Sequence, residues 1–396
     1  MDHYQSAGHV AQSLRPDDPV ICLRPHAAIR AGRWFVDHFP GHVLYAVKAN
    51  PAPEILEALW AGGVRRFDVA SLREIALVRD LLPDAELAYM HPVKAVEAIR
   101  RAYVDHGVRV FALDSQTELK KILEATGHAK DLSLCVRLSV GNSFAKLSLG
   151  AKFGVREAQA PALLLAARQH AARLGLCFHV GSQAMHPAAY TAALDVAKRV
   201  IARAGVVLDV IDVGGGFPSR YPGMEPPPLA AYVREIAAAV EKMPIPETCE
   251  LWCEPGRALV AEAASLIVRV EARKDDVLYL NDGTYGSLFD AGVPRWVYPV
   301  RLLRTRRSVA ALRDFAFYGP TCDDMDFMAG PFQVPADVKA GDYLEIGMLG
   351  AYGATMRTGF NGFHQGATVI AEDAPMLEAY GEGKPAPRYA ARIGEG

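Results

Sequence analysis

The feature that most constrains the fold of this 396-residue chain is a regular alternation of short apolar runs with longer helix-like segments. The runs are continuously apolar, which is typical of strands buried on both faces of a parallel sheet. The segments between them are rich in Ala, Leu, Glu and Arg and predict helices. Eight strands are expected in this way, at residues 42–48, 66–70, 86–90, 110–113, 132–138, 176–180, 208–213 and 250–253.

Eight strands separated by helices predict an α/β fold built on a closed parallel (β/α)8 barrel. An open doubly wound sheet is the structural alternative. The barrel is favoured because the polar residues that follow so many strands would then converge on a single mouth. We place the barrel at residues 26–257.

The pattern changes from about residue 258, where strands linked by turn residues replace the alternation. We expect an all-β domain at 258–375, joined by an N-terminal strand at 20–25, and a loose tail at 376–396. Its strands are predicted at residues 265–272, 277–281, 300–304, 313–318 and 342–346.

Composition limits the partners and the compartment. A formal net charge of −2 shows no basic excess, which argues against nucleic acid or an anionic membrane as partner. Neither a bilayer-length apolar run nor a signal-peptide core is present in the sequence, so a cytoplasmic protein is expected. The six cysteines lack Cys-x-x-Cys spacing, which favours reduced thiols over disulfides or a metal site.

A lysine ends the first barrel strand. In Tyr-Ala-Val-Lys-Ala-Asn-Pro (45–51), Lys48 follows an apolar run and precedes an Asn-Pro breaker. Most lysines at the end of a strand are ordinary surface residues. A partly desolvated lysine at a barrel mouth can instead be held as the neutral amine that attacks a carbonyl group.

Three later strands also end in polar or glycine-rich residues. His179 and Ser182 follow the sixth strand, the seventh runs into Gly-Gly-Gly at 214–216, and the eighth ends in Glu254-Pro-Gly-Arg257. Each has a plain structural interpretation: a rim histidine, a tight turn and a salt bridge. Ser71 and Glu74, after the second strand, have the spacing of a helix capping box and are interpreted as one.

Taken together, these strand ends supply an amine, a flat imidazole, a carboxylate, an arginine and glycine amides. Pyridoxal 5'-phosphate needs each of them: a lysine for its aldehyde, a flat group against its ring, an acid for its pyridine nitrogen and donors for its phosphate. A protonated pyridine ring is the electron sink that stabilises a carbanion. The strand ends therefore predict a site for this cofactor.

The successive motifs resemble those of the pyridoxal-phosphate group IV decarboxylases, which have the alanine-racemase-like barrel. They occur in the family's order from about residue 45 to 363: YAVKAN, FDVAS, KFGV, FHVGS, DVGGGFP, CEPGR, NDGTYGSLFD, GPTCDDMDF and GAYGATMRTGFNGF. Within the family, GPTCD is most similar to ornithine decarboxylases. Diaminopimelate decarboxylases typically have Cys-Glu-Ser where this chain has Cys322-Asp323-Asp324.

The resemblance implies a role for each matching residue. Lys48 would bind the cofactor's aldehyde, His179 would stack on its ring and Glu254 would pair with its pyridine nitrogen. Further contacts, chiefly to the phosphate, would come from Ser182, Gly214, Gly215, Gly216, Gly256, Arg257 and Tyr352.

For the substrate, the resemblance implies a homodimer with shared active sites. Asp323 would face the distal ammonium across the dimer interface, and Cys322 would protonate the carbanion left after carbon dioxide departs. Asp290 resembles a second amine-binding aspartate of the family, although the interval from Tyr285 to Asp290 is shorter here than in the eukaryotic enzymes.

The implied activity is decarboxylation of a basic L-amino acid, foremost ornithine to putrescine, with lysine to cadaverine beside it. Two aspartates in the distal pocket fit an ammonium better than a carboxylate, which disfavours diaminopimelate. A racemase and a non-catalytic, pyridoxal-phosphate-binding regulator remain alternatives. One methylene of pocket length separates ornithine from lysine, and the sequence does not decide between them.

Overall fold

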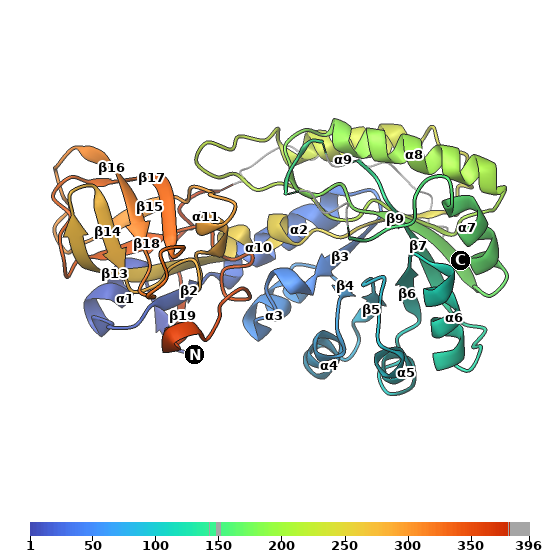
Figure 1. Cartoon of the computed structure of the whole chain (residues 1–396), viewed down its shortest axis with the longest axis horizontal. Helices are drawn as coiled ribbons and strands as arrows, with labels where there is room; N and C mark the ends of the chain where they lie inside the picture. The colour runs from blue at the N-terminus through green and yellow to red at the C-terminus, as the bar shows by residue number, and fades with distance from the viewer. Residues whose placement is uncertain (142, 148–151, 379, 381–396) are drawn as a thin grey trace.

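The computed structural model describes residues 1–141, 143–147, 152–378 and 380, and it forms two domains (Figure 1). Eight parallel strands close a barrel in the order β11-β12-β3-β4-β5-β6-β7-β9, which confirms the predicted fold class and excludes the open sheet. The barrel strands are β3 (His42–Ala46), β4 (Arg66–Val69), β5 (Glu86–Tyr89), β6 (Val110–Leu113), β7 (Ser133–Leu138), β9 (Arg173–Phe178), β11 (Val210–Asp212) and β12 (Glu250–Cys253).

Helices surround the barrel, and their ends follow local sequence signals. Ser71 and Ser115 cap two of them, each accepting a hydrogen bond of 3.2 Å from a backbone N–H in the first turn, as the capping interpretation of Ser71 predicts. These helices are α2 (Pro25–His38), α3 (Pro53–Ala61), α4 (Leu72–Leu81), α5 (Val96–Val104), α6 (Gln116–Ala125), α7 (Ala160–Arg168), α8 (Ala188–Ala204) and α9 (Leu229–Val240). None of the helices in the described ranges is both long and apolar enough to cross a membrane.

Side chains of each strand point alternately into and out of the barrel, and this places apolar groups in its interior and polar groups at its mouth. One buried cluster contains a residue from most of the strands: Leu44, Ala88, Met90, Ala112, Cys135, Cys177, Val210 and Trp252. Because successive side chains of a strand point to opposite faces, the residues two positions after Val210 and Trp252 share their side. Asp212 and Glu254 therefore lie above this cluster at the carboxyl ends of adjacent strands.

The second domain is built around β13 (Ala264–Lys274). The N-terminal strand β2 (Val20–Leu23) pairs antiparallel with β13 and parallel with β19 (Ala367–Ala371). Segments from both ends of the sequence thus lie in the same sheet. Its other strands are β1 (His3–Tyr4), β14 (Val277–Leu280), β15 (Val300–Leu303), β16 (Leu312–Tyr318), β17 (Phe327–Pro335) and β18 (Tyr343–Ile346).

Several elements of this domain were not predicted from sequence, among them β1, α11 (Phe289–Gly292) and the three that follow. β17 contains Gly330 and Pro331 and ends at Pro335, residues that normally mark turns. It tolerates them because it lies at the edge of the sheet, where only β16 pairs with it among the described strands. The short strand β19 and helix α1 (Ala7–Leu14) were also missed; α1 falls in a segment expected to be a polar leader.

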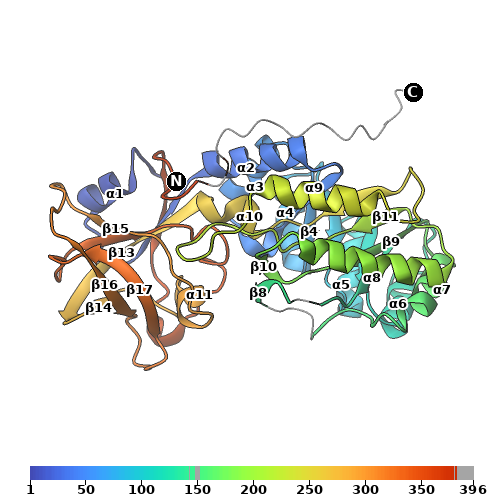
Figure 2. The same ribbon diagram turned by 90° about the horizontal axis from the view of Figure 1, so that it is seen from above.

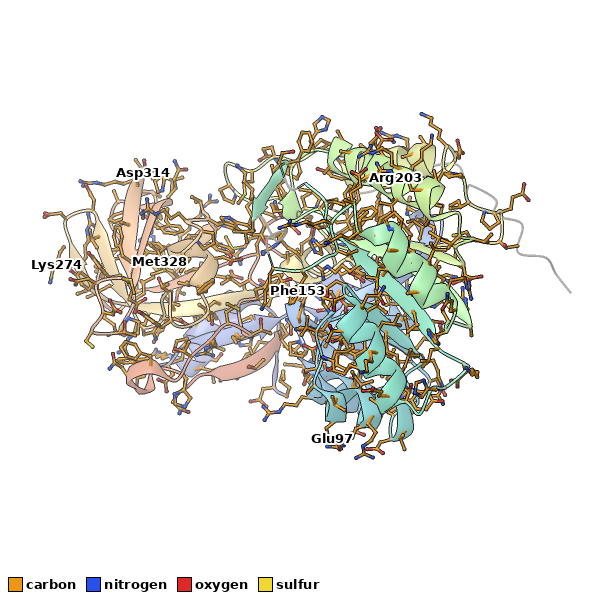
Figure 3. All side chains as sticks on the ribbon, turned by 45° about the vertical axis from the view of Figure 1, so that its right-hand side comes forward. Glu97, Phe153, Arg203, Lys274, Asp314 and Met328 are labelled. Atoms are coloured by element: carbon orange, nitrogen blue, oxygen red, sulfur yellow. The ribbon has the colours of Figure 1, made fainter. Side chains whose placement is uncertain are left out.

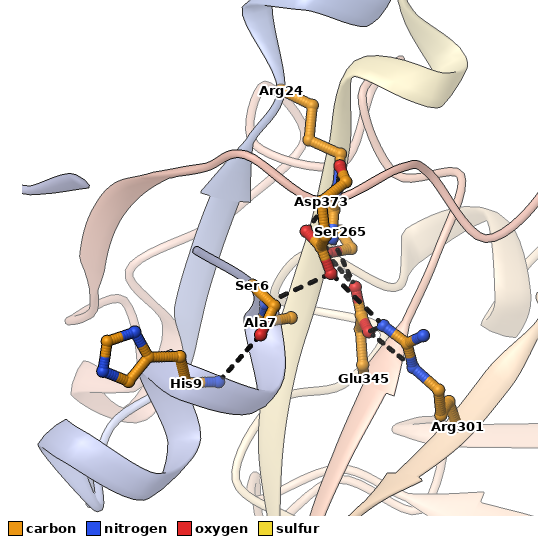
Figure 4. Close-up of polar contacts among 8 residues, drawn as sticks. All are labelled: Ser6, Ala7, His9, Arg24, Ser265, Arg301, Glu345 and Asp373. Atoms are coloured by element: carbon orange, nitrogen blue, oxygen red, sulfur yellow. Dashed lines mark hydrogen bonds and ion pairs between the residues drawn. The ribbon is translucent and has the colours of Figure 1, made fainter. Parts of the chain in front are cut away.

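A buried charged cluster lies in the β-domain at the point where the chain passes from β2 into the first barrel helix (Figure 4). Arg24 directly precedes α2, and its guanidinium donates to Ser265 at 2.7 Å, to Glu345 at 2.8 Å and to Asp373 at 2.7 Å. Glu345 also pairs with Arg301. Removing one partner from such a cluster would leave a buried charge unpaired, so the cluster fixes how the first barrel helix leaves the sheet.

The β-domain presents a short helix to the barrel. Helix α11 (Phe289–Gly292) lies on the side of the β-domain that faces the barrel, opposite β8 (Ala145–Leu147) and β10 (Ser182–Ala184) (Figure 2). In the view of Figure 3, Phe153 lies on the part of the barrel domain nearer the β-domain, whereas Glu97 and Arg203 lie on the outer helices α5 and α8. Most of the predicted tail lies outside the described residues, but Tyr380 is buried and donates its hydroxyl hydrogen bond to the Ala258 carbonyl.

Candidate active site

Lys48 lies in a single 3₁₀ turn (Val47–Ala49) directly after β3, and its side chain is 43% exposed. Its Nζ atom lies 3.5 Å from Oδ2 of Asp68, a buried residue on the neighbouring strand β4. The negative charge of Asp68 raises the pKa of Lys48 by more than burial lowers it. Desolvation therefore does not by itself favour the neutral amine in this structure, because the paired strand brings a carboxylate to Lys48.

The lysine turn is held by the β-domain. The Asn50 side chain donates to the Gly350 carbonyl at 2.8 Å, and the Tyr352 backbone N–H donates to the Ala49 carbonyl at 2.8 Å. Tyr352 has a φ of 64°, a left-handed conformation that costs about 1 kcal/mol or more in a non-glycine residue. The interdomain contact thus maintains a strained loop that carries a tyrosine to the barrel mouth.

His179 follows β9 and is a neutral ring held in one orientation. Its Nδ1 atom accepts a hydrogen bond of 3.0 Å from the Gly181 backbone N–H. Burial lowers its pKa well below the usual value, and the positive charge of Lys48 adds to this effect. A Cβ atom on Gly215 would lie 3.0 Å from Nε2, so a larger residue at position 215 would crowd the imidazole ring.

The glycine turn after β11 packs against the end of β9. A Cβ atom on Gly214 would lie 1.9 Å from the Phe178 carbonyl oxygen, and one on Gly216 would lie 2.5 Å from the Gly181 oxygen. Both glycines also have positive φ values, 67° and 105°. Only glycine permits this approach, which brings the turn beside Ser182 and gives the mouth a backbone surface suited to an anion.

Arg257 is buried at the start of the short helix α10 (Arg257–Val260). Its guanidinium lies 4.2 Å from the Trp296 ring and 4.9 Å from the Tyr352 ring. It donates to the Tyr221 hydroxyl at 3.0 Å and to Asp290 Oδ2 at 3.1 Å, while its Nε has no partner among the described residues. Asp290 is thereby placed against a proposed phosphate ligand, and its role as an ammonium ligand stays a prediction.

Two charged residues at the mouth were not singled out from sequence. Asp212 is fully buried at the end of β11. Arg137, on β7, opposes part of the rise in the pKa of Lys48 and adds to the lowering of the pKa of His179. Burial raises the pKa of Asp212 and, further, that of Glu254. The sequence feature that could have identified both residues is a charged residue inside an otherwise apolar run, as in Val-Ile-Asp (210–212) and Cys-Val-Arg (135–137).

Cys322 and Asp323 lie in the β-domain, in the loop between β16 and β17. Cys322 is exposed, and its backbone N–H donates to the Asn361 side chain at 3.1 Å. Asp323 accepts a hydrogen bond of 2.5 Å from the Tyr285 hydroxyl, which lowers the pKa of Asp323. Within the described part of this chain, neither residue forms a hydrogen bond or ion pair with the groups at the barrel mouth.

The residues at the mouth fit pyridoxal phosphate. The fit rests on a partly exposed lysine, a neutral fixed imidazole, a buried carboxyl, a glycine turn and a buried arginine whose Nε–H has no partner within the described ranges. Each group matches one part of the cofactor. Fold and site together define a barrel enzyme of the pyridoxal-phosphate class.

Comparison with known proteins agrees with the assignment to the pyridoxal-phosphate class. The family model described as "Pyridoxal-dependent decarboxylase, pyridoxal binding domain" matches residues 28–261. The lysine/ornithine decarboxylase of Selenomonas ruminantium is 36% identical over 354 residues, 86% of each chain. The chain therefore belongs to the pyridoxal-phosphate-dependent group IV decarboxylase family, and its cofactor is pyridoxal phosphate.

Solved structures show the same fold. The Vibrio vulnificus lysine/ornithine decarboxylase complexed with cadaverine aligns with a TM-score of 0.79 at 29% identity, over 93% of this chain and 100% of the other. The Paramecium bursaria Chlorella virus arginine decarboxylase bound to agmatine aligns with a TM-score of 0.81 at 26% identity, over 91% of this chain and 98% of the other.

Proposed function

We propose that this protein decarboxylates a basic L-amino acid, with ornithine or lysine as substrate and putrescine or cadaverine as product. The observation that carries the proposal is Asp323, a carboxylate held by Tyr285 beside Cys322 on a β-domain loop. An ionised carboxylate suits a distal ammonium, whereas the distal end of diaminopimelate also carries an acid. The names of the relatives support the same substrate class.

The barrel residues would hold the cofactor and tune it. Pyridoxal phosphate supplies, when bound, a protonated ring that accepts the electron pair left at Cα as carbon dioxide departs. Lys48 would bind the aldehyde, and Glu254 would keep the ring nitrogen protonated. His179 would fix the plane of the ring, and Arg257 with the glycine turn would hold the phosphate.

Asp323 and Cys322 would act on the substrate. The hydrogen bond from Tyr285 lowers the pKa of Asp323, so its carboxylate is ionised at neutral pH and can pair with an ammonium. The Cys322 thiol would return a proton to Cα after decarboxylation. Both groups are carried by the loop between β16 and β17, and their positions on the chain's surface suit action on a second subunit.

Exposed apolar side chains lie on this loop and on residues 356–363, which the loop contacts through the hydrogen bond from Cys322 to Asn361. We call this surface the Cys322 patch; it consists of four exposed side chains, Met325, Met356, Phe360 and Phe363, with exposed fractions of 70%, 38%, 41% and 48%. The ring centroids of Phe360 and Tyr285 also lie 4.9 Å apart. Exposed apolar side chains gathered near one loop are expected at a subunit interface. They support a symmetric homodimer in which each barrel receives Cys322 and Asp323 from the other subunit.

Carbon dioxide release tests the proposal. The cofactor-loaded enzyme should be assayed with L-ornithine, L-lysine, L-arginine and diaminopimelate at matched concentrations. We expect the highest kcat/KM with ornithine or lysine. Diaminopimelate as the best substrate would overturn the assigned ammonium site. A cofactor-loaded protein that releases carbon dioxide from none of the four would support a binding role without turnover, and formation of D-amino acids would support a racemase.

A further inference from the structure

Asp212 and Glu254 end adjacent barrel strands, and both side chains are buried at the mouth. Val210 and Trp252, two residues earlier on each strand, belong to the same interior cluster. The two carboxyls therefore share one compartment of the barrel. Glu254 alone has a proposed task, so Asp212 is a buried acid that the mechanism above does not use.

One oxygen of Asp212 is satisfied and the other is not. Oδ1 accepts a hydrogen bond of 2.8 Å from the Gly214 backbone N–H. Oδ2 is buried and has no N–H or hydroxyl donor among the described residues. The group within hydrogen-bond reach is the carboxyl of Glu254, which can donate only when it carries a proton. Because a buried acceptor without a donor is costly, the geometry favours a proton between the two acids.

The surrounding groups preserve this arrangement. Asp68 adds a negative charge from β4 that disfavours a second ionised acid, while Lys48 and Arg137 oppose it only in part. The hydrogen bond adds to the rise in the pKa of Glu254 and offsets part of the rise in the pKa of Asp212, which locates the proton on Glu254. His179 and the thiols of Cys135, Cys177 and Cys253 also lie near the pair. Burial lowers the pKa of His179 and raises those of the thiols, so these groups stay neutral.

We propose that Asp212 is a positioning residue: its carboxylate accepts a hydrogen bond from the Glu254 carboxyl and so stores at Glu254, before the cofactor enters, the proton that the ring nitrogen requires. When the cofactor binds, the O–H of Glu254 would turn from Asp212 to the ring nitrogen and give up its proton there, leaving a Glu254 carboxylate beside a protonated ring. The inference rests on the proposed role of Glu254, and it adds a buried second acid that sets the protonation state of the first.

The test compares Asp212→Asn with Asp326→Asn in the full-length protein, with and without bound pyridoxal phosphate. Asp326 is the matched control because it is equally buried but accepts hydrogen bonds from Thr284 and Thr321. Urea unfolding is followed from about pH 5.5 to about pH 8.5 at one protein concentration. In Asp212→Asn the amide oxygen can still accept from Gly214, and its N–H can donate to ionised Glu254.

The direction in which stability changes with pH follows from the raised pKa values of the two acids in the folded state. The folded wild type without cofactor holds at the pair a proton that the unfolded chain releases above about pH 4 to 5, so the pair contributes a stability that falls as pH rises, by up to ~tenfold in the folding equilibrium constant per pH unit. Buried histidines such as His179, whose pKa is lowered on folding, contribute in the opposite direction below about pH 6.5, but equally in every variant, so the measured quantity is the difference between the variant and wild-type slopes. Asp212→Asn should flatten this slope and be more stable than wild type at the alkaline end of the range. Asp326→Asn should lose stability equally at every pH and keep the wild-type slope.

An Asp212→Asn variant that is weakened at every pH, with the wild-type slope, would overturn the proposal. Glu254→Gln should flatten the same slope, because the amide introduced there can donate to ionised Asp212. These measurements need no turnover, so they test the shared proton of Asp212 and Glu254 separately from the role of Glu254 in catalysis. A flattened slope with unchanged decarboxylation in Glu254→Gln would keep the carboxyl pair and reject the role of Glu254 at the ring. As a second measurement, the affinity for pyridoxal phosphate should depend less on pH in Asp212→Asn than in wild type.

Discussion

The guanidinium of Arg257 and the carboxylate of Asp290 form a buried ion pair, with 3.1 Å between Nη2 and Oδ2, although one ends the barrel and the other lies in the β-domain. The pair fixes the arginine against Trp296 and closes the phosphate end of the proposed site with a residue from the second domain. A carboxylate used in this way is poorly placed to serve a substrate ammonium as well, which favours Asp323 for that task.

Asp290→Asn should therefore weaken cofactor binding more than substrate binding. Loss of a buried charge partner costs on the order of 2 kcal/mol or more, which is roughly 30-fold in the dissociation constant of pyridoxal phosphate. Titration of the cofactor-free variant measures this constant, and the KM for ornithine and lysine is measured at saturating cofactor. A large rise in KM with unchanged cofactor affinity would instead place the ammonium at Asp290.

Lys48→Ala should abolish turnover and the absorbance of the covalently bound cofactor, because Lys48 is the amine that the first barrel strand delivers to the mouth. Borohydride reduction of the wild-type holoenzyme followed by peptide mapping should find the label on Lys48. The informative competitor is Lys94, a buried lysine whose pKa desolvation lowers to about 8 but which is paired with Glu118. A label on Lys94 would show that the site is misassigned.

Glu254→Gln should leave cofactor binding largely intact while slowing the chemical step. An amide cannot hold the ring nitrogen protonated, and a loss of about 1.4–2.7 kcal/mol of transition-state stabilisation would lower the rate roughly 10- to 100-fold. Single-turnover decarboxylation measures the step directly. A rate equal to that of wild type would remove Glu254 from the mechanism.

Asp323→Asn should raise the KM for diamino acids with little change in cofactor affinity. The loss of one partner of a desolvated ammonium pair corresponds to roughly 30-fold or more in KM. Asp324→Asn is the matched control, since the next residue carries the same charge and is exposed. Equal effects of the two substitutions, or none in either, would place the ammonium elsewhere.

Mixed mutants test whether two subunits share a site. Lys48→Ala and Asp323→Ala proteins should each be nearly inactive when pure. After equal mixing and subunit exchange, half of the dimers are hybrids with one intact and one doubly damaged site, so activity should recover to roughly a quarter of wild type. Absence of recovery, with exchange demonstrated by mass labelling, would mean that each chain completes its own site.

The barrel was predictable because its strands are local features of the sequence. A continuous apolar run, a turn and an amphipathic helix recur along the chain, and β6 and β12 were expected at the residues where they occur. The same locality put Lys48 at a strand end, since a lysine followed by Asn-Pro ends a strand wherever it lies. The motif order then predicted the family, which the comparisons confirm.

The electrostatics of the site were decided by the tertiary structure alone. Asp68 reaches Lys48 through the pairing of two strands, and Asp290 reaches Arg257 through the packing of two domains. Both contacts depend on register and on how distant segments meet, neither of which periodicity contains. The sequence by itself therefore determined that Lys48, His179, Glu254 and Arg257 follow barrel strands, whereas only the folded chain determined which charges lie close enough to set their pKa values.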